Sequence, residues 1–145
     1  MPHFNNMSRL LLAIVLLGSL AACGNDISTA TLPDVKLTST SPAVKLVQNA
    51  VASGLPTIVE FGAVGCASCR EMKMVLDSVA QHTQGRANVL NIDISKDFEA
   101  QDIYQIQLIP TQVFFDAHGH EIERHMGILT EAEVSARLGL SATPG

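Results

Sequence analysis

The chain has 145 residues, of which 47% are hydrophobic and 16% charged, and its formal net charge is −5. This length suits one domain with its own core and excludes two, and the apolar content excludes a chain that is disordered throughout. The negative charge and the lack of tryptophan argue against nucleic-acid binding, so we expect no nucleic acid among the partners.

Residues 1–22 have the pattern of an export signal. Arg9 precedes an unbroken apolar run over residues 10–17, and a segment of small residues ends at Cys23. The run is shorter than the roughly 20 residues that a membrane-spanning helix needs. The sequence Leu-Ala-Ala-Cys that ends at Cys23 resembles the lipobox of bacterial lipoproteins, which implies cleavage before Cys23 and lipidation of that residue. A secretory signal without a lipid and a buried hydrophobic helix are the alternatives.

Residues 23–40 follow as the lipidated cysteine and a segment rich in Ser, Thr, Asp and Gly. Because this segment has little hydrophobic periodicity, we interpret it as a flexible tether. The expected location is therefore the bacterial cell envelope, with the protein anchored to a membrane by its lipid and facing the periplasm or the cell exterior. Residues 41–145 remain as the folded domain.

Helices and strands alternate along the domain. A Ser-Pro pair at residues 41–42 is typical of a helix start, and Thr130 with Glu133 has the spacing of a capping box. In chain order the predicted elements are a helix from Ser41 to Gly54, a strand over 56–62, a helix over 66–83, a strand over 87–93, a helix over 95–104, strands over 111–116 and 121–126, and a helix from Thr130. A strand–helix–strand crossover makes one parallel pair and a hairpin closes the sheet. The pattern predicts an α/β fold with a mixed central sheet of about four strands flanked by helices in three layers.

The residues with the clearest chemistry are Cys66 and Cys69, which form a Cys-Ala-Ser-Cys motif where a buried strand meets a helix. The unpaired N–H groups and the dipole of a helix N-terminus favour the thiolate form of Cys66. Cys69 lies one turn later, at the start of the apolar stripe, and should be more buried. This asymmetry suits thiol–disulfide exchange, in which an exposed thiol attacks and a sheltered thiol resolves the mixed disulfide.

Two other interpretations of the cysteine pair remain open. The pair can be half of a zinc site completed by His118, His120 or His125. However, no second cysteine pair exists, and His118 and His120 fall in a predicted hairpin where exposed polar residues are ordinary. It can also be an inert structural disulfide, although so small a loop contributes little stabilisation. We expect no metal and no cofactor.

Glu60 interrupts the most apolar predicted strand of the chain. Burial of an unpaired carboxylate is costly and raises its pKa. We therefore predict that Glu60 exchanges a proton with Cys69, the alternative being an edge position that reaches solvent. Ile109 and Pro110 stand immediately before another strand, where proline marks a strand start, a loop or a cis turn.

Several segments of the domain, including the cysteine motif, occur in the same order as the motifs of one known family. These segments are Val59-Glu60-Phe61, Cys66-Ala67-Ser68-Cys69-Arg70, Asn91-Ile92-Asp93, the stretch from Tyr104 to Thr111, and Phe115-Asp116-Ala117-His118-Gly119 followed by Gly127. Over residues 43–140 they resemble the thioredoxin superfamily, and within it exported, lipid-anchored thioredoxin-like proteins.

The resemblance implies a role for each matching residue. Cys66 matches the nucleophilic and Cys69 the resolving member of a redox-active disulfide, and Glu60 stands where the family has a buried acid. Pro110 matches the cis-proline beside the redox pair, and Ile109 the residue whose backbone pairs with an extended substrate. Three positions depart from the family pattern: Gly65 replaces a tryptophan, Ala67-Ser68 replaces Gly-Pro, and Val89 replaces a lysine.

The function expected from the sequence is an envelope thiol–disulfide oxidoreductase that reduces disulfides of exported proteins. Its partners would be disulfide-containing exported proteins and a membrane or envelope electron donor, because an oxidising compartment does not recharge an isolated reductant. Two functions of other classes are alternatives. One is a copper chaperone that uses both thiolates, and the other is an adaptor that keeps the fold for partner binding.

Overall fold

A four-stranded mixed sheet forms the centre of residues 39–140, the part of the chain that this computed structural model describes. The expected export signal, Cys23 and most of the tether lie outside the described residues. The strand order is β2-β1-β3-β4, with β1 parallel to β2 and each other neighbouring pair antiparallel. The strands are β1 (Thr57–Gly62), β2 (Asn88–Asp93), β3 (Thr111–Phe115) and β4 (Glu121–Met126). This topology confirms the predicted fold class.

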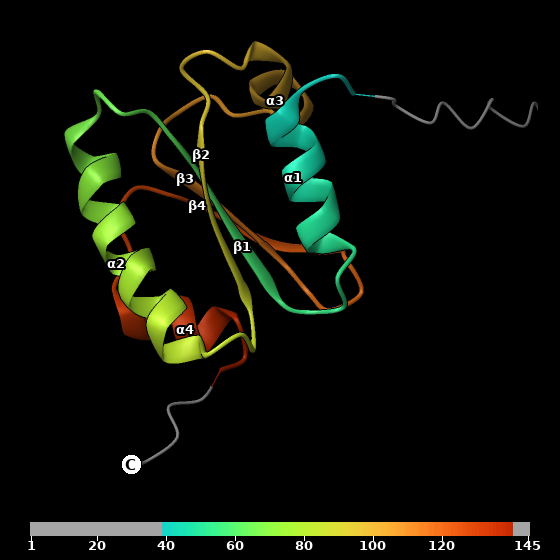
Figure 1. Ribbon diagram of the computed structural model, residues 1–145. Coiled ribbons are helices and arrows are strands. Elements are labelled where there is room, and N and C mark those ends of the chain that lie inside the picture. Colours follow the sequence, from blue (N-terminus) through green and yellow to red (C-terminus); the bar gives the residue numbers. More distant parts are fainter. Residues whose placement is uncertain (1–38, 141–145) are drawn as a thin grey trace, which may run out of the picture. The chain divides into compact units, whose positions relative to one another are not determined.

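Two pairs of helices cover the two faces of the sheet (Figure 1). They are α1 (Pro42–Val51) with α3 (Phe98–Ile103) on one face, and α2 (Ala67–Thr83) with α4 (Glu131–Arg137) on the other. Side chains along β1 alternate between the faces. Ile58 packs into the core under α2 and α4, while Val59 and Phe61 pack into the core under α1 and α3. β1 is thus buried on both faces and pairs with a strand on each side, as β3 also does.

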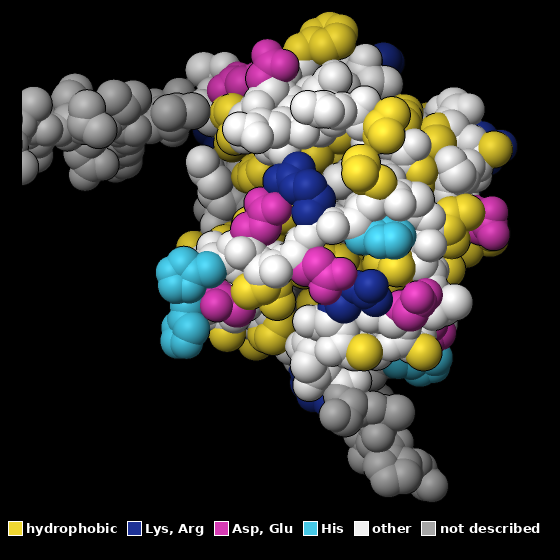
Figure 2. Space-filling model, turned by 180° about the vertical axis from the view of Figure 1, so that it is seen from behind, with side chains coloured by type: hydrophobic (Ala, Val, Ile, Leu, Met, Phe, Trp, Pro, Cys, Tyr) yellow, Lys and Arg dark blue, Asp and Glu magenta, His cyan; other side chains and the backbone are white. Residues whose placement is uncertain are grey.

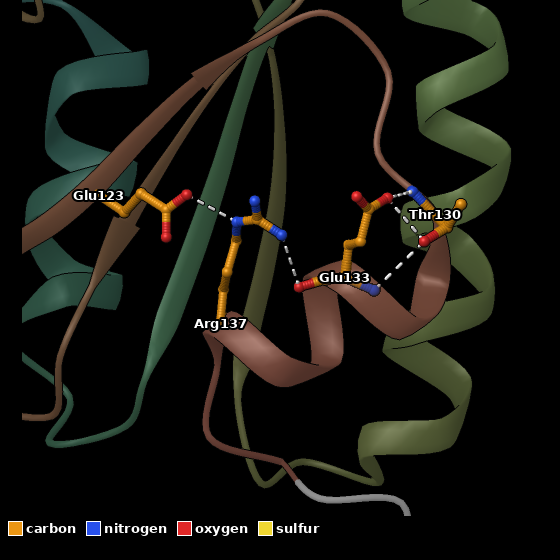
Figure 3. Close-up of polar contacts among 4 residues, drawn as sticks. All are labelled: Glu123, Thr130, Glu133 and Arg137. Atoms are coloured by element: carbon orange, nitrogen blue, oxygen red, sulfur yellow. Dashed lines mark hydrogen bonds and ion pairs between the residues drawn. The ribbon is translucent and has the colours of Figure 1, made fainter.

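The helix starts at Ser41 and Thr130 are confirmed. The Ser41 hydroxyl accepts the N–H of Val44 at 3.0 Å. At the start of α4, the backbone N–H of Glu133 donates to the Thr130 hydroxyl while the Glu133 carboxylate accepts the Thr130 N–H (Figure 3). The same view shows Arg137 donating at 2.7 Å to Glu123 on β4, which ties the end of α4 to the sheet.

The start of α3 differs from the prediction. The helix begins at Phe98 rather than at Ser95, and Asp97 is its N-cap, because its side chain accepts the Ala100 N–H at 3.0 Å. Ser95 instead donates its N–H to the Asp93 carboxylate, in a turn that follows β2. Asp97 is held in place by the Ser41 hydroxyl, which lies far away in the sequence and donates to it at 2.5 Å.

Within residues 39–140, no helix is both long enough and apolar enough to cross a bilayer. On the face drawn in Figure 2, Lys and Arg side chains are interspersed with Asp and Glu side chains, so the described part of that face carries no large basic patch.

Candidate active site

The cysteine pair lies in the connection between β1 and α2. The N–H of Cys66 bonds to the Ala63 carbonyl at 3.0 Å, which closes the turn after the strand, and α2 begins at the next residue, Ala67. Cys66 and Cys69 form a disulfide with their Cα atoms 5.3 Å apart. The helical spacing of residues 66 and 69 thus brings the two sulfurs into bonding distance.

Cys66 is the N-cap of α2. Its sulfur accepts the backbone N–H of Cys69 at 3.1 Å and lies 3.3 Å from the hydroxyl oxygen of Ser68. A sulfur in this position faces the positive end of the helix dipole and two hydrogen-bond donors. All three features stabilise a thiolate at Cys66 once the disulfide is reduced. The contact from Ser68 was not expected from the sequence, where this residue only separates the two cysteines.

Cys69 is shielded, as the helical pattern predicts. It is buried with 4% of its surface exposed, whereas Cys66 is half-buried. Cys69 starts the buried stripe of α2 that continues with Met72, Leu76 and Val79. The pair therefore offers one accessible sulfur and one sulfur directed toward the sheet.

Glu60 is buried in the central strand, with 3% of its surface exposed, so the alternative of an edge position is wrong. Its Oε1 atom has no hydrogen-bond partner. Burial raises the pKa of the Glu60 carboxyl to about 7, against the opposing effect of the positive charge of Lys73. A carboxyl with such a pKa exists in both protonation states near neutral pH, as a group that accepts and returns a proton requires.

Gly62 makes room for the Glu60 carboxyl. A Cβ atom at position 62 would overlap Glu60 Oε1 and would lie 3.0 Å from Cys69 Cβ and 3.2 Å from Cys69 Sγ. The carboxyl oxygen and the Cys69 sulfur are therefore near neighbours that share the space left by the missing side chain. We did not identify Gly62 from the sequence. The available signal was its position two residues after Glu60 on a strand, which places both residues on one face.

A pocket of about 390 Å³ opens beside Glu60 and Cys69. It is also lined by Lys73 on α2 and by Asn91 and Asp93 on β2. Lys73 is itself half-exposed and forms an ion pair with Asp77 at 2.6 Å. The pocket gives water a route to the buried carboxyl, and a proton passed to Glu60 can leave through it.

Ile109 and Pro110 lie at the same end of the sheet as the cysteine pair. The peptide bond between them is cis. Thr111 follows them and is opposite Phe61, the residue before Gly62, in the antiparallel pairing of β3 with β1. Pro110 is buried, whereas Ile109 is 39% exposed. The register thus brings the start of β3 to the end of β1, from which the cysteine loop departs.

Metal-ligating side chains do not gather around this pair. Among residues 39–140, no group of three or more His, Cys, Asp or Glu side chains is placed to hold a metal ion. His118 and His120 are exposed in the turn between β3 and β4, as expected.

Comparison with known proteins identifies the family. The thioredoxin family model matches residues 30–139. The chain belongs to the thioredoxin family. Its relatives include thioredoxin 1 of Nostoc sp., which is 28% identical over 91 residues that make up 63% of this chain and 84% of that protein. The thioredoxin-like protein slr0233 of Synechocystis sp. is 32% identical over 83 residues, 57% of this chain and 78% of that protein.

A solved thioredoxin structure supports the same assignment. Chloroplastic thioredoxin z matches with a TM-score of 0.59 and 28% identity, over 66% of this chain and 86% of the thioredoxin z chain. A thioredoxin-family domain with a Cys-x-x-Cys pair after its central strand is a thiol–disulfide oxidoreductase. The residues of this thioredoxin-like domain thus combine an accessible sulfur at a helix N-terminus with a buried sulfur beside a carboxyl.

Proposed function

We propose that this protein is an envelope thiol–disulfide oxidoreductase that reduces disulfides of exported proteins. The observation that carries the proposal is the asymmetry of the pair. Cys66 is half-buried and its sulfur accepts hydrogen bonds at the start of α2, whereas Cys69 is buried next to the Glu60 carboxyl. Such an arrangement favours attack of Cys66 on a substrate disulfide and release of the reduced substrate by Cys69.

The first step is attack by the Cys66 thiolate on a substrate disulfide. A bond forms between Cys66 Sγ and one substrate sulfur, the substrate disulfide breaks, and the second substrate sulfur leaves as a thiolate that takes a proton from water. The Cys69 N–H and the Ser68 hydroxyl, at 3.1 and 3.3 Å from the Cys66 sulfur, stabilise the thiolate before the attack.

The second step releases the product. The Glu60 carboxylate accepts the thiol proton of Cys69, and the resulting thiolate attacks Cys66 Sγ. The bond to the substrate breaks, the reduced substrate leaves, and the disulfide between Cys66 and Cys69 forms. Two electrons have then passed to the substrate. The proton on Glu60 leaves through the pocket that Glu60 shares with Lys73 and Asp93.

Substrate binding is assigned to the segment before β3. Ile109 is exposed there, and Pro110 ends the segment beside the end of β1. An extended substrate that pairs with the backbone of Ile109 would place its disulfide near the cysteine loop, in the manner of an added strand.

The location and partners follow from the first 40 residues. The lipobox-like sequence that ends at Cys23 supports a lipid anchor, and residues 24–40 support a tether between the anchor and the domain. The clients are then exported proteins, and a membrane or envelope protein with its own dithiol must reduce the domain again after each turnover.

Capture of clients in cells tests this function. In full-length protein carrying Cys69→Ser, the mixed disulfide on Cys66 cannot be resolved, so substrates should accumulate as adducts that a reducing agent releases. The identified adducts should be exported proteins with disulfides. Protein carrying both Cys66→Ser and Cys69→Ser is the matched control and should capture none. Recovery of cytosolic proteins alone would reject the envelope role, and equal recovery from the control would reject the exchange mechanism.

A serine at position 23 tests the anchor separately. Without the thiol no lipid can be attached, so Cys23→Ser should move the protein from the membrane fraction to the soluble fraction. The variant should keep the exchange activity of its domain, which begins about 18 residues later. Fractionation and immunoblotting measure the distribution, and an unchanged membrane fraction would contradict lipidation at this residue.

A further inference from the structure

One row of polar side chains crosses the sheet at the level of Glu60. In the strand register Glu60 is opposite Asn91 on β2 and opposite Gln112 on β3. Gln112 is in turn opposite His125 on β4. Residues paired in this way point to the same face of a sheet, here the face under α2 and α4. The ends of the row are accessible, whereas the two central residues, Glu60 and Gln112, are 3% and 0% exposed.

The side-chain amide of Gln112 has no hydrogen-bond partner. Among residues 39–140, only three buried side-chain nitrogen or oxygen atoms lack a partner, and they are Gln112 Nε2, Gln112 Oε1 and Glu60 Oε1. Buried polar groups without partners are costly and therefore rare in folded proteins. All three atoms belong to two cross-strand neighbours, which do not hydrogen-bond to each other while the disulfide between Cys66 and Cys69 is formed.

Packing alone does not require a glutamine at this position. The adjacent row on the same face places Ile58 opposite Phe114 across β1 and β3, and both belong to the apolar core under α2 and α4. Gln112 lies two residues before Phe114 on β3 and points to the same face. An apolar side chain at position 112 would pack there without leaving polar atoms unpaired.

We propose that the Gln112 amide is the hydrogen-bond partner of the Glu60 carboxyl in the reduced protein, and that it positions this carboxyl as the proton acceptor of Cys69. The inference rests on the role of Glu60 proposed above. An amide suits both protonation states, since Nε2–H donates to a carboxylate and Oε1 accepts from a protonated carboxyl. Opposite residues on antiparallel strands have Cβ atoms about 5 Å apart, within reach of two such long side chains.

Of the two amides opposite Glu60, Asn91 is exposed to solvent and Gln112 is fully buried, so Gln112 is the one that lacks water as an alternative partner. Gly62 and Cys69 border the carboxyl on one side. Lys73 is half-exposed and already paired with Asp77. The titratable and charged groups that face Glu60 and Gln112 are Cys69, Arg70 and Lys73 on α2, Asp93 at the end of β2, and His125 on β4.

The pH dependence of the release step tests the inference. Reduced protein is mixed in a stopped-flow instrument with one equivalent of dithiobis(nitrobenzoate), an aromatic disulfide that releases one coloured thiolate on attack by Cys66 and a second on attack by Cys69. In Gln112→Met the carboxylate loses a donor while the side chain keeps its size. The hydrogen bond that the amide donates to the charged carboxylate is stronger than the bond that it accepts from the protonated carboxyl, so its loss should raise the pKa of Glu60. The pH midpoint of the second-phase rate should therefore rise by about one unit.

Two comparison variants separate this effect from a general loss of packing. Phe114→Leu disturbs the core on the same strand and face, and it should leave the midpoint of the second phase unchanged. In a Glu60→Gln background, Gln112→Met should have no effect on the midpoint, because no carboxyl is left to stabilise. An unchanged midpoint in Gln112→Met, or the same shift in the Glu60→Gln background, would overturn the inference.

Failure of the inference differs from failure of the proposed function. If Glu60→Gln alone leaves the pH dependence of the second phase as it is in the native sequence, the proposed role of Glu60 is wrong. If Glu60→Gln changes it and Gln112→Met does not, only the role of Gln112 is wrong.

A measurement on the protein with its native sequence does not depend on whether the variants fold. In reduced, isotopically labelled protein, the side-chain amide resonances of Gln112 should shift with pH at the same midpoint as the Glu60 carboxyl carbon. Gln112 amide resonances that stay constant through the titration of Glu60 would contradict the inference.

Discussion

Replacing Cys66 or Cys69 by serine should abolish turnover of a disulfide substrate in both cases, but by different routes. Cys66→Ser removes the attacking sulfur, so neither an adduct nor a product should form. Cys69→Ser keeps the sulfur that accepts the two hydrogen bonds at the start of α2 and should form an adduct that is not released. Because the two residues act as one unit, each change should lower the steady-state rate by on the order of 10³-fold or more.

Mass spectrometry of the intact protein distinguishes the two variants. After incubation with a disulfide peptide, Cys69→Ser should gain the mass of one peptide thiol and lose it on reduction, whereas Cys66→Ser should gain nothing. The double variant is the control and should behave like Cys66→Ser alone. An adduct of equal yield on Cys66→Ser would show that Cys69 can attack, which its burial at 4% exposure argues against. Full cellular function of the double variant would instead indicate the adaptor alternative.

Replacing Glu60 by glutamine should change how stability depends on pH. The pKa of this carboxyl is about 7 in the folded protein and has its ordinary value of 4.5 in the unfolded chain. Between these values the folded state binds more protons than the unfolded state, so the free energy of unfolding falls as the pH rises from 4.5 to 7. The loss is up to about 3 kcal/mol when complete, and it is absent below pH 4.5, where both states are protonated.

Glutamine keeps the shape of the side chain but does not ionise. Glu60→Gln should therefore be more stable than the native sequence at pH 8, by up to about 3 kcal/mol, and should lose this advantage at pH 4.5. Urea unfolding at the two pH values measures the difference. Glu71→Gln, on the exposed side of α2, is a matched control that should leave the pH dependence as it is. Parallel stability curves for Glu60→Gln and the native sequence would mean that burial does not raise this pKa.

The same variant should also separate the two steps of exchange. Glu60→Gln removes the proton acceptor of Cys69 but does not alter the hydrogen bonds to Cys66. At pH 7 the release step should slow by about 10²-fold, while attack by Cys66 should change little. A gain in stability together with a loss of rate is the expected signature of a buried carboxyl that is retained for chemistry.

Local patterns predicted the elements of the fold well wherever the signal lies within one turn or one strand. Ser41 and Thr130 start helices as expected, because each hydroxyl caps a backbone N–H three residues later. The start of α3 was predicted two residues too early, because Ser95 and Asp97 are both typical N-cap residues, and the Ser41 hydroxyl, 56 residues away, bonds to Asp97. The adjacent sequence offers both caps and does not decide between them.

The residues of the candidate site also fall into two groups: those that the local sequence indicates and those that only the folded structure reveals. The cysteine spacing and the strand that precedes it indicated Cys66, Cys69 and Glu60, because a charged residue inside an apolar strand is conspicuous. Gln112 carries a weaker form of the same signal, one amide directly before the apolar residues 113–115 of its strand, and it was missed. Gly62 was missed as well, because an absent side chain has meaning only once its neighbours are known.

The sequence by itself determined the order of helices and strands, the redox pair at the start of a helix, and the buried acid two residues before the end of its strand, since each of these depends on residues close together in the chain. Only the tertiary structure decided that Glu60 faces Gln112 and that Gly62 opens space between Glu60 and Cys69. The physical reason is that strand register and helix placement are set by non-local packing, and a shift of one residue would turn these side chains to the opposite face.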